Sequence, residues 1–237
     1  MLDILFLSWN RWEFTELSLR LLFENTNWEL TRRLVVYDDG SDSTTVGRLQ
    51  SLIGEAPCEV VFRQTHERSP VGVMLHYLRN DPAEQFAKID NDIAVPPGWL
   101  ESLLCVWSPE IDLLGMEIGH PHGLQTDDMS FIKRMFVPAR HIGGVGMMRS
   151  SAFGGARRMR ANGRFGFTEW QHTNRPRVGW IFPEVNAPCL DRVPVEPWVS
   201  LSAFYEQVGW QRPWWKYPME SAHHWDWFPS TIRAEST

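Results

Sequence analysis

Polar residues that suit metal and phosphate chemistry follow three of the apolar runs in this 237-residue chain. The three groups are Ser8-Trp9-Asn10-Arg11, Asp38-Asp39 and Asp90-Asn91-Asp92. In the last group two carboxylates stand two residues apart, which suits Mg²⁺ or Mn²⁺ held by oxygen ligands and by the phosphates of a substrate. Each group alone is equally compatible with a solvated turn, because Asp and Asn favour turns. The three together predict one shared site.

The segments that would position these groups alternate between strand and helix patterns over residues 1–110. Short apolar runs separated by helices of ten or more residues predict βαβ units and an α/β fold with a mostly parallel sheet flanked by helices. Ligands of such sheets bind at the carboxyl ends of the strands, where the polar groups fall. The expected strands are Leu2–Ser8, Arg33–Tyr37, Glu59–Arg63 and Gln85–Ile89; the expected helices are Trp12–Asn25, one capped by Ser43, Val71–Leu78 and one opened by Pro97.

The second half of the chain has a looser pattern. We expect strands at Asp112–Glu117 and Gly143–Met148 and a helix at Ser150–Arg160, followed by a tail from Pro194 that is rich in Pro and Trp. No internal repeat or low-complexity linker divides the sequence. We therefore expect a single domain over residues 1–237 with an irregular second half.

Composition narrows the setting in which the protein works. No apolar run approaches the roughly 18 residues of a membrane span, and the first residues read as a strand rather than a signal peptide. The three cysteines are odd in number and far apart in the sequence, which fits reduced thiols. We expect a cytoplasmic protein; a viral origin would place it in the cytoplasm of the host.

The three polar groups, in this order and spacing, resemble the nucleotide-sugar half of family 2 glycosyltransferases with the GT-A fold. The resemblance covers residues 2–107 well and reaches loosely to about residue 182. It implies a nucleotide-sugar-binding half at 1–110, an acceptor-binding and catalytic half at 111–193 and a tail at 194–237. The donor is expected to be a UDP-sugar. The donor-binding residues that the resemblance implies are Ser8, Asn10, Arg11, Asp38, Asp39, Asp90 and Asn91.

The resemblance also implies individual roles. Asp38 or Asp39 would contact the nucleoside, Asp90 the ribose or sugar, and Asp92 the Mn²⁺ or Mg²⁺ that bridges the diphosphate. Asp90 is a second candidate metal ligand. His223 and His224 near the C-terminus would complete the metal or diphosphate site, unless they are a pair of surface histidines.

Glu169 is the candidate catalytic base. Gly143-Gly144-Val145-Gly146-Met147-Met148 matches the Gly-rich strand of the family, and Gly166-Phe167-Thr168-Glu169-Trp170 matches its acidic motif. The family often has two acids at that point, whereas this chain has Glu169 followed by Trp170. The alternative for Glu169 is an acid that favours the N-terminus of a helix.

Charge is unevenly distributed, and this bears on the acceptor. Residues 131–180 carry ten basic side chains and one acid, Glu169, although the whole chain has a net charge of −6. A surface of about +9 beside the catalytic base favours a polyanion, and interleaved aromatic residues can stack on bases. We therefore expect an acceptor hydroxyl on a hydroxymethylated pyrimidine of DNA. The candidate acceptor-binding residues are Arg157, Arg158, Arg164, Trp170 and Arg175.

Other interpretations remain open. A saccharide or lipid-linked saccharide is an equally weighted acceptor, with some of the 13 tryptophans as sugar-stacking platforms. A nucleotidyltransferase would usually have a Gly-rich phosphate loop after its first strand, and Ser8-Trp9-Asn10-Arg11 contains no glycine. A non-catalytic carbohydrate- or nucleic-acid-binding module would not need carboxylates at the strand ends. The sequence leaves the oligomeric state open.

Overall fold

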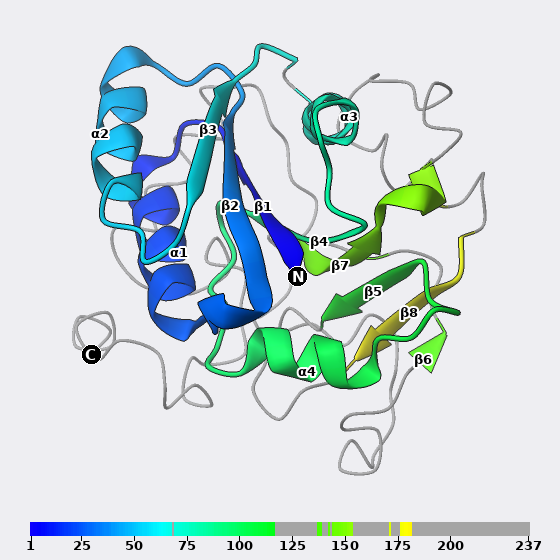
Figure 1. Cartoon of the computed structure of the whole chain (residues 1–237). Helices are drawn as coiled ribbons and strands as arrows, with labels where there is room; N and C mark the ends of the chain where they lie inside the picture. The colour runs from blue at the N-terminus through cyan, green and yellow to red at the C-terminus, as the bar shows by residue number, and fades with distance from the viewer. Residues whose placement is uncertain are drawn as a thin grey trace, which may run out of the picture.

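The computed structural model describes residues 1–67, 69–116, 137–138, 142, 144–153, 171 and 176–181. These residues form an α/β fold in which one mixed sheet is flanked by helices on both faces (Figure 1). The expected α/β class is confirmed. No helix within the described ranges is long and apolar enough to cross a membrane.

The elements follow the alternation that the sequence predicts. The strands are β1 Leu2–Ser8, β2 Thr31–Asp38, β3 Val60–Gln64, β4 Gln85–Asp90, β5 Leu113–Met116, β6 Val137–Pro138, β7 Val145–Arg149 and β8 Val178–Ile181. The helices are α1 Trp12–Asn25, α2 Ser43–Ile53, α3 Pro70–Arg79 and α4 Trp99–Val106, with short 3-10 turns η1 Trp28–Leu30 and η2 Ser150–Phe153.

The strand order within the described residues is β3-β2-β1-β4-β7-β5-β8-β6. The first four strands in this order pair in parallel, as βαβ units require. β7 then enters antiparallel between β4 and β5, and β8 pairs parallel with β5. The described strands of the second half thus extend the same sheet.

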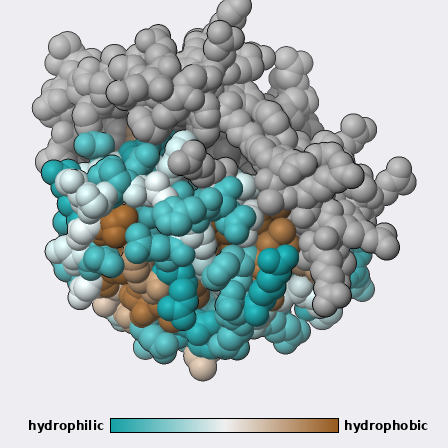
Figure 2. All heavy atoms as spheres, turned by 90° about the horizontal axis from the view of Figure 1, so that it is seen from above, coloured by the Kyte–Doolittle hydropathy of each residue, from teal (hydrophilic) through white to brown (hydrophobic). Residues whose placement is uncertain are grey.

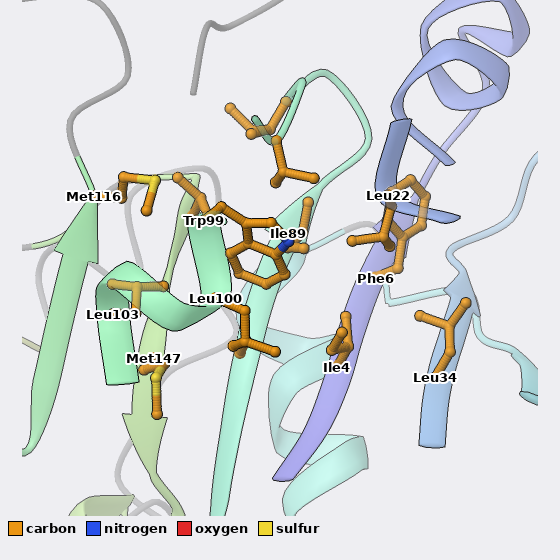
Figure 3. Packing of buried hydrophobic residues seen from close by; sticks show 14 of the residues in the cluster. Ile4, Phe6, Leu22, Leu34, Ile89, Trp99, Leu100, Leu103, Met116 and Met147 are labelled. Atoms are coloured by element: carbon orange, nitrogen blue, oxygen red, sulfur yellow. The ribbon is translucent and has the colours of Figure 1, made fainter. Parts of the chain in front are cut away.

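Alternate residues of the strands supply two apolar layers. Ile4 and Phe6 of β1 belong to a cluster with residues of α1, α2 and α4, whereas Leu5 and Leu7 pack with α3 on the opposite face. Figure 1 shows α1 and α2 on one side of β1–β3 and α3 on the other. In the first layer, Trp99 of α4 is fully buried and lies among aliphatic side chains from the strands (Figure 3). These layers hold the strand ends in place.

Two helix starts differ from the expectation. Ser43 is the first residue of α2, and Asp42 is the cap: its carboxylate accepts hydrogen bonds from the Thr45 backbone N–H at 2.9 Å and from the Thr45 hydroxyl at 2.8 Å. A carboxylate at this position satisfies free N–H groups of the first turn. Pro97 precedes α4, which begins at Trp99 after Gly98 in a left-handed conformation (φ 71°). Proline therefore does not occupy the first turn.

The remaining expectations for the second half are met in part. The strand expected at Asp112–Glu117 is β5, and the Gly-rich strand expected at Gly143–Met148 is β7. Of the helix expected at Ser150–Arg160, the 3-10 turn η2 covers Ser150–Phe153, and the rest lies outside the described residues.

Candidate functional site

The polar groups singled out in the sequence meet at one edge of the sheet. Ser8 at the end of β1 is paired with Asp38 at the end of β2, and Leu7 is paired with Asp90 at the end of β4. The Asp39 N–H donates to the Ser8 carbonyl at 2.8 Å, which ties the first two strand ends together. From above the molecule of Figure 1, the described surface is mainly hydrophilic, with smaller hydrophobic areas (Figure 2). The loops that follow β1, β2 and β4 thus begin at the same edge of the sheet, as parallel pairing requires.

Asn10 joins the loop after β1 to the loop after β2. Its backbone N–H donates to Ser41 Oγ at 2.7 Å, and its side-chain oxygen accepts from the Asp42 N–H at 3.1 Å. Ser41 in turn donates its hydroxyl and, at 3.1 Å, its backbone N–H to the fully buried Asp38 carboxylate. Asp38 therefore organises the loop that follows β2.

Asp39 is anchored on its other side. Its carboxylate accepts from the Thr65 hydroxyl at 2.9 Å and from the Ser69 backbone N–H at 2.8 Å. Gly40 follows with φ 85°, and a Cβ at this position would lie 2.9 Å from His66 Nδ1. The turn after β2 therefore needs glycine for its conformation and for the close approach of His66.

Asp90 is held by a lysine of its own strand. Lys88 Nζ lies 2.5 Å from Asp90 Oδ1, and the lysine side chain is only 4 % exposed. The other oxygen, Oδ2, lies 3.1 Å from the point that a Cβ of Gly144 would occupy. Burial raises the pKa of Asp90, the Lys88 ammonium opposes this rise and the nearby Asp92 carboxylate adds to it. A side chain at position 144 would therefore crowd the oxygen that Lys88 does not contact.

Asp92 and Asn91 are contacted by one guanidinium. Arg11 donates from Nη1 to Asp92 Oδ2 at 3.0 Å and from Nη2 to Asn91 Oδ1 at 2.5 Å. The amide nitrogen of Asn91 donates to Thr15 Oγ1 at 2.8 Å and to the Asn10 carbonyl at 3.3 Å. The first loop and the Asp90-Asn91-Asp92 motif are therefore bonded directly to each other, about 80 residues apart in sequence.

The backbone of the first loop adopts an uncommon conformation. Asn10 and Arg11 both have positive φ, 48° and 53°. Non-glycine residues in this left-handed region cost free energy and persist where surrounding contacts hold them, commonly at functional sites. Here the bonds of Asn10 to the second loop and of Arg11 to the motif hold both residues.

Helix α1 supports the segment after the motif. Ser18 donates to the Ile93 carbonyl at 2.6 Å, and Asn25 donates to the Val95 carbonyl at 2.8 Å. The Ile93 N–H closes a turn onto the Asp90 carbonyl at 3.1 Å. Two polar side chains of α1, one of them on its buried face, therefore fix the path of the chain that follows Asp92.

The donor set suits a divalent cation that also binds phosphate. Within the described ranges, no three His, Cys, Asp or Glu side chains are grouped to enclose a metal ion. Asp90 and Asp92 provide two carboxylates, which matches the way Mg²⁺ and Mn²⁺ are held by one or two carboxylates together with substrate phosphates.

The catalytic and acceptor-binding candidates lie outside the described residues. These are Glu169, Arg157, Arg158, Arg164, Trp170, Arg175, His223 and His224. The nearest described residue to Glu169 in sequence is Gln171, whose buried side chain accepts a hydrogen bond from the Ile142 N–H at 2.8 Å. The side chain of Gln171 is therefore bonded to the backbone three residues before β7 begins.

Arg149 and Arg177, the two basic residues of the 131–180 segment that the structure describes, both have acidic partners. Arg177 lies 2.9 Å from Asp112, and Arg149 lies 3.5 Å from Glu84 and stacks over Trp107. Both acids lie outside the segment, so they neutralise part of its charge of about +9. The expectation of a polyanion site therefore depends on the other eight basic side chains.

Sequence reasoning did not assign a role to Lys88 or Thr15. Lys88 carried a usable signal, because it is a charge inside the apolar run Phe86-Ala87-Lys88-Ile89 and two residues before Asp90, so that both side chains face the same side of the strand. Thr15 carried none, because its contact with Asn91 depends on how α1 packs on the sheet.

Comparisons with known proteins agree with this arrangement. No protein-family model and no curated protein matches the sequence. Among solved structures, Staphylococcus aureus TarS 1–349 aligns with 13% identity and a TM-score of 0.56 over 76% of this chain and 59% of that chain. The structure of TarS 1–349 in complex with UDP-GlcNAc aligns with 14% identity and a TM-score of 0.55, over 76% of this chain and 55% of that chain. The mannosyltransferase PcManGT from Pyrobaculum calidifontis, in complex with GDP-Man and Mn²⁺, aligns with 12% identity and a TM-score of 0.60, over 89% of this chain and 64% of that chain.

These likenesses define the fold. The chain has the GT-A type of fold found in glycosyltransferases that take nucleotide sugars, with its acidic motif at the end of β4. It spans 55–64% of the length of the structures named above. The resemblance stated from the sequence is therefore confirmed at the level of the fold.

Proposed function

We propose that the protein is an inverting glycosyltransferase that moves a sugar from a nucleotide-sugar, expected to be a UDP-sugar, to an acceptor hydroxyl with the help of Mn²⁺ or Mg²⁺. The observation that carries the proposal is the meeting of Asp38, Asp90 and Asp92 at one sheet edge of a GT-A fold, with Arg11 bonded to the motif. A solvated turn at each strand end would not require bonds between the loops, whereas a shared site does.

The described residues would act mainly on the donor. Asp38 and Asp39 shape the loop after β2 that would receive the nucleoside, and Ser8 and Asn10 border it. Asp90 would face the ribose or sugar, and Asp92 would hold the metal next to Asn91. The metal, when bound, supplies positive charge for the departing diphosphate. Arg11 would bind phosphate oxygens of the donor through two parallel N–H groups of its guanidinium.

Glu169 would take the proton from the acceptor hydroxyl as that oxygen attacks the anomeric carbon. A carboxylate that acts as base must come within hydrogen-bond reach of the proton. Support comes from Gln171, two residues after Glu169, whose side chain accepts a hydrogen bond from the Ile142 N–H, while the carbonyl of nearby Gly144 accepts from the Asp90 N–H at 3.0 Å. His223 and His224 are proposed to complete the metal or diphosphate site.

For the acceptor we propose a hydroxymethylated pyrimidine in DNA. The support is the excess of basic residues at 131–180, of which Arg157, Arg158, Arg164 and Arg175 are candidate phosphate contacts and Trp170 a stacking residue. The pyrimidine would have to be flipped or exposed to bring its hydroxyl to the base. A saccharide or lipid-linked saccharide is the second candidate, favoured by the 13 tryptophans.

A transfer assay tests both levels of the proposal. The full chain is incubated with Mn²⁺ and UDP- or GDP-sugars, and with hydroxymethylated DNA, plain DNA, oligosaccharides or no acceptor. We expect nucleoside diphosphate release that depends on hydroxymethylated DNA and falls steeply with salt, since phosphate contacts release counterions. Transfer to saccharides alone would replace the DNA proposal. Absence of turnover and of nucleotide-sugar binding would support a non-catalytic module.

Two substitutions test the assigned roles. Asp92→Asn should abolish metal-dependent transfer, and Glu169→Gln should abolish transfer while donor binding, measured by calorimetry, remains. Removal of a general base commonly costs 10²–10⁴-fold in rate. Full activity of either variant would exclude the role assigned to that residue. Arg20→Gln, on the exposed face of α1, serves as a control with unchanged activity.

A further inference from the structure

Both carboxylates of the Asp90-Asn91-Asp92 motif already have a cationic partner within the chain. Lys88 Nζ contacts Asp90 at 2.5 Å, and Arg11 Nη1 contacts Asp92 at 3.0 Å. The motif therefore does not present two uncompensated charges to a divalent cation. A metal that binds Asp92 must compete with a guanidinium that occupies one of its oxygens.

The two cations differ in how easily they can leave. Lys88 sits in β4, which is hydrogen-bonded to β1 on one side and β7 on the other. Moving its ammonium away from Asp90 would leave a buried charge without a partner, which is strongly unfavourable. Lys88 is therefore a fixed partner of Asp90.

Arg11 lies in a loop, whereas Lys88 lies in a strand, so the Arg11 side chain can change its position more easily. It precedes α1, its side chain is 11% exposed, and its guanidinium carbon lies 5.6 Å from the centre of the Phe14 ring. An aromatic face stabilises a guanidinium without competing for the carboxylate. The guanidinium can thus leave Asp92 without losing all of its stabilising contacts.

We propose that Arg11 is an exchangeable counter-ion of the metal site. In the donor-free protein its guanidinium holds Asp92 and Asn91 in place; when a divalent cation binds Asp92, the guanidinium leaves that oxygen and binds the phosphates of the nucleotide. This inference rests on the proposed function, because it takes Asp92 as a metal ligand. Arg11 is then a positioning residue before the donor binds and a phosphate ligand afterwards.

Such an exchange couples the binding of metal and nucleotide. Metal alone must displace Arg11 from its contact with the Asp92 carboxylate and gives the guanidinium no new anion in exchange, so the affinity for metal alone is low. A nucleoside diphosphate provides that partner, so the metal binds more tightly in its presence. By linkage, the nucleotide must bind more tightly in the presence of metal by the same factor.

The experiment measures Mn²⁺ dissociation constants by electron paramagnetic resonance on the full chain, alone and with saturating UDP or GDP. It compares the wild type with Arg11→Gln, Arg11→Lys and the control Arg20→Gln, which removes the same charge from an exposed ion pair on α1. We expect Arg11→Gln to bind Mn²⁺ alone about tenfold more tightly, the size of one charge-assisted hydrogen bond. Its coupling factor between Mn²⁺ and nucleotide should fall by at least about fivefold.

Arg11→Lys keeps the charge but cannot bond Asp92 and Asn91 as a planar fork, and should fall between the wild type and Arg11→Gln. It also carries the comparison if Arg11→Gln does not fold, which thermal melting shows. An unchanged or weaker Mn²⁺ affinity in both variants overturns the exchange, as does an unchanged coupling factor.

The outcome is separable from that of the proposed function. Metal-dependent sugar transfer by the wild type together with unaltered Mn²⁺ binding in the Arg11 variants overturns the exchange alone. A wild type that binds no Mn²⁺, with or without nucleotide, overturns both the exchange and the metal role of Asp92. The nucleotide-sugar transfer assay then tests what remains of the proposed function.

Discussion

A lysine inside an apolar strand is unfavourable unless a carboxylate accepts its charge. Lys88 meets this condition through Asp90, two residues along the same face of β4. In the neighbouring antiparallel strand β7, Gly146 is the partner of Lys88, and a Cβ on Gly144, just before β7, would lie 3.1 Å from Asp90 Oδ2. At the scale of residues, one carboxylate of the candidate site is thus oriented from within its own strand.

Lys88→Met should destabilise the fold by about 1–3 kcal/mol, because Asp90 loses a charge-assisted hydrogen bond while its carboxylate stays partly buried. The measurement is urea unfolding of the wild type, both single variants and the double variant with Asp90→Asn. We expect the loss from Lys88→Met to be smaller in the Asp90→Asn background, since the pair is coupled. Additive losses would show that the two side chains do not interact.

At the scale of elements, β7 has to pass between β4 and β5 with little room. A Cβ on Gly146 would lie 2.6 Å from the Leu114 carbonyl oxygen and 3.0 Å from the Gly115 Cα, both of them backbone atoms. Gly115 is the partner of Gly146 in the ladder, so this crossing has no side chain on either strand. The Gly-rich composition of this strand therefore has a steric cause.

Gly146→Ala should destabilise the protein by about 1–3 kcal/mol, the range for forcing extra atoms into a packed interior. The matched control is Gly47→Ala in α2, where a Cβ would meet no atom within 4 Å. Alanine is favoured over glycine in helices, so that variant should gain up to about 1 kcal/mol. Chemical unfolding of both variants measures the change in the free energy of unfolding, which should be negative for Gly146→Ala and positive for Gly47→Ala. An increase for Gly146→Ala would contradict the steric explanation.

At the scale of the whole molecule, charged residues are arranged differently at the two ends of the parallel strands. The carboxyl ends of the strands hold the candidate site, and the amino end of β1 holds the fully buried Asp3. Arg32 donates to both oxygens of Asp3 at 2.8 Å, and the Tyr77 hydroxyl donates to it at 3.0 Å. Asp3 thereby links β1, β2 and α3 at the end of the molecule away from the site.

Stability should depend on pH through Asp3. Burial alone would raise the pKa of Asp3, but the hydrogen bonds from Arg32 and Tyr77 outweigh it and hold this pKa below the ordinary value of 3.8. A lowered folded pKa adds stability that is fully present above the unfolded pKa and is lost as the pH falls through the folded value. Asp3→Asn should therefore lose about 3 kcal/mol at neutral pH, and the difference from the wild type should shrink below about pH 4.

The control for this prediction is Asp81→Asn. Asp81 lies 3.7 Å from Arg32 and 3.4 Å from Arg33, both of which also contact Asp3, but it is 74% exposed, and asparagine tolerates its φ of 61°. Exposed ion pairs contribute about 0–1 kcal/mol, so this variant should stay close to the wild type. Thermal or urea unfolding across pH 3–7 provides the test; equal losses for both variants would mean that burial of Asp3 does not matter.

Much of the first half was predictable from local patterns. The pattern and length of the apolar segments placed β1 and α1 at the residues where the structure has them, because a mostly apolar run and an amphipathic face can be read directly from the order of residues. Asp38, Asp90 and Asp92 could be assigned to one edge since parallel strands end on the same side. Helix starts were less predictable: Asp42, not Ser43, caps α2, because adjacent residues can each provide a capping oxygen.

The order of residues was thus enough to place four parallel strands and to bring their polar ends together, since both depend on periodicity and on the geometry of parallel pairing. It was not enough to show which charges meet. The contacts of Arg11 with Asp92 and of Arg177 with Asp112 arise only when the strands and α1 are packed, because they join residues that are far apart in the chain and close in space. Those pairings turn an acidic motif into a charge-balanced site and show that part of the basic segment has structural partners.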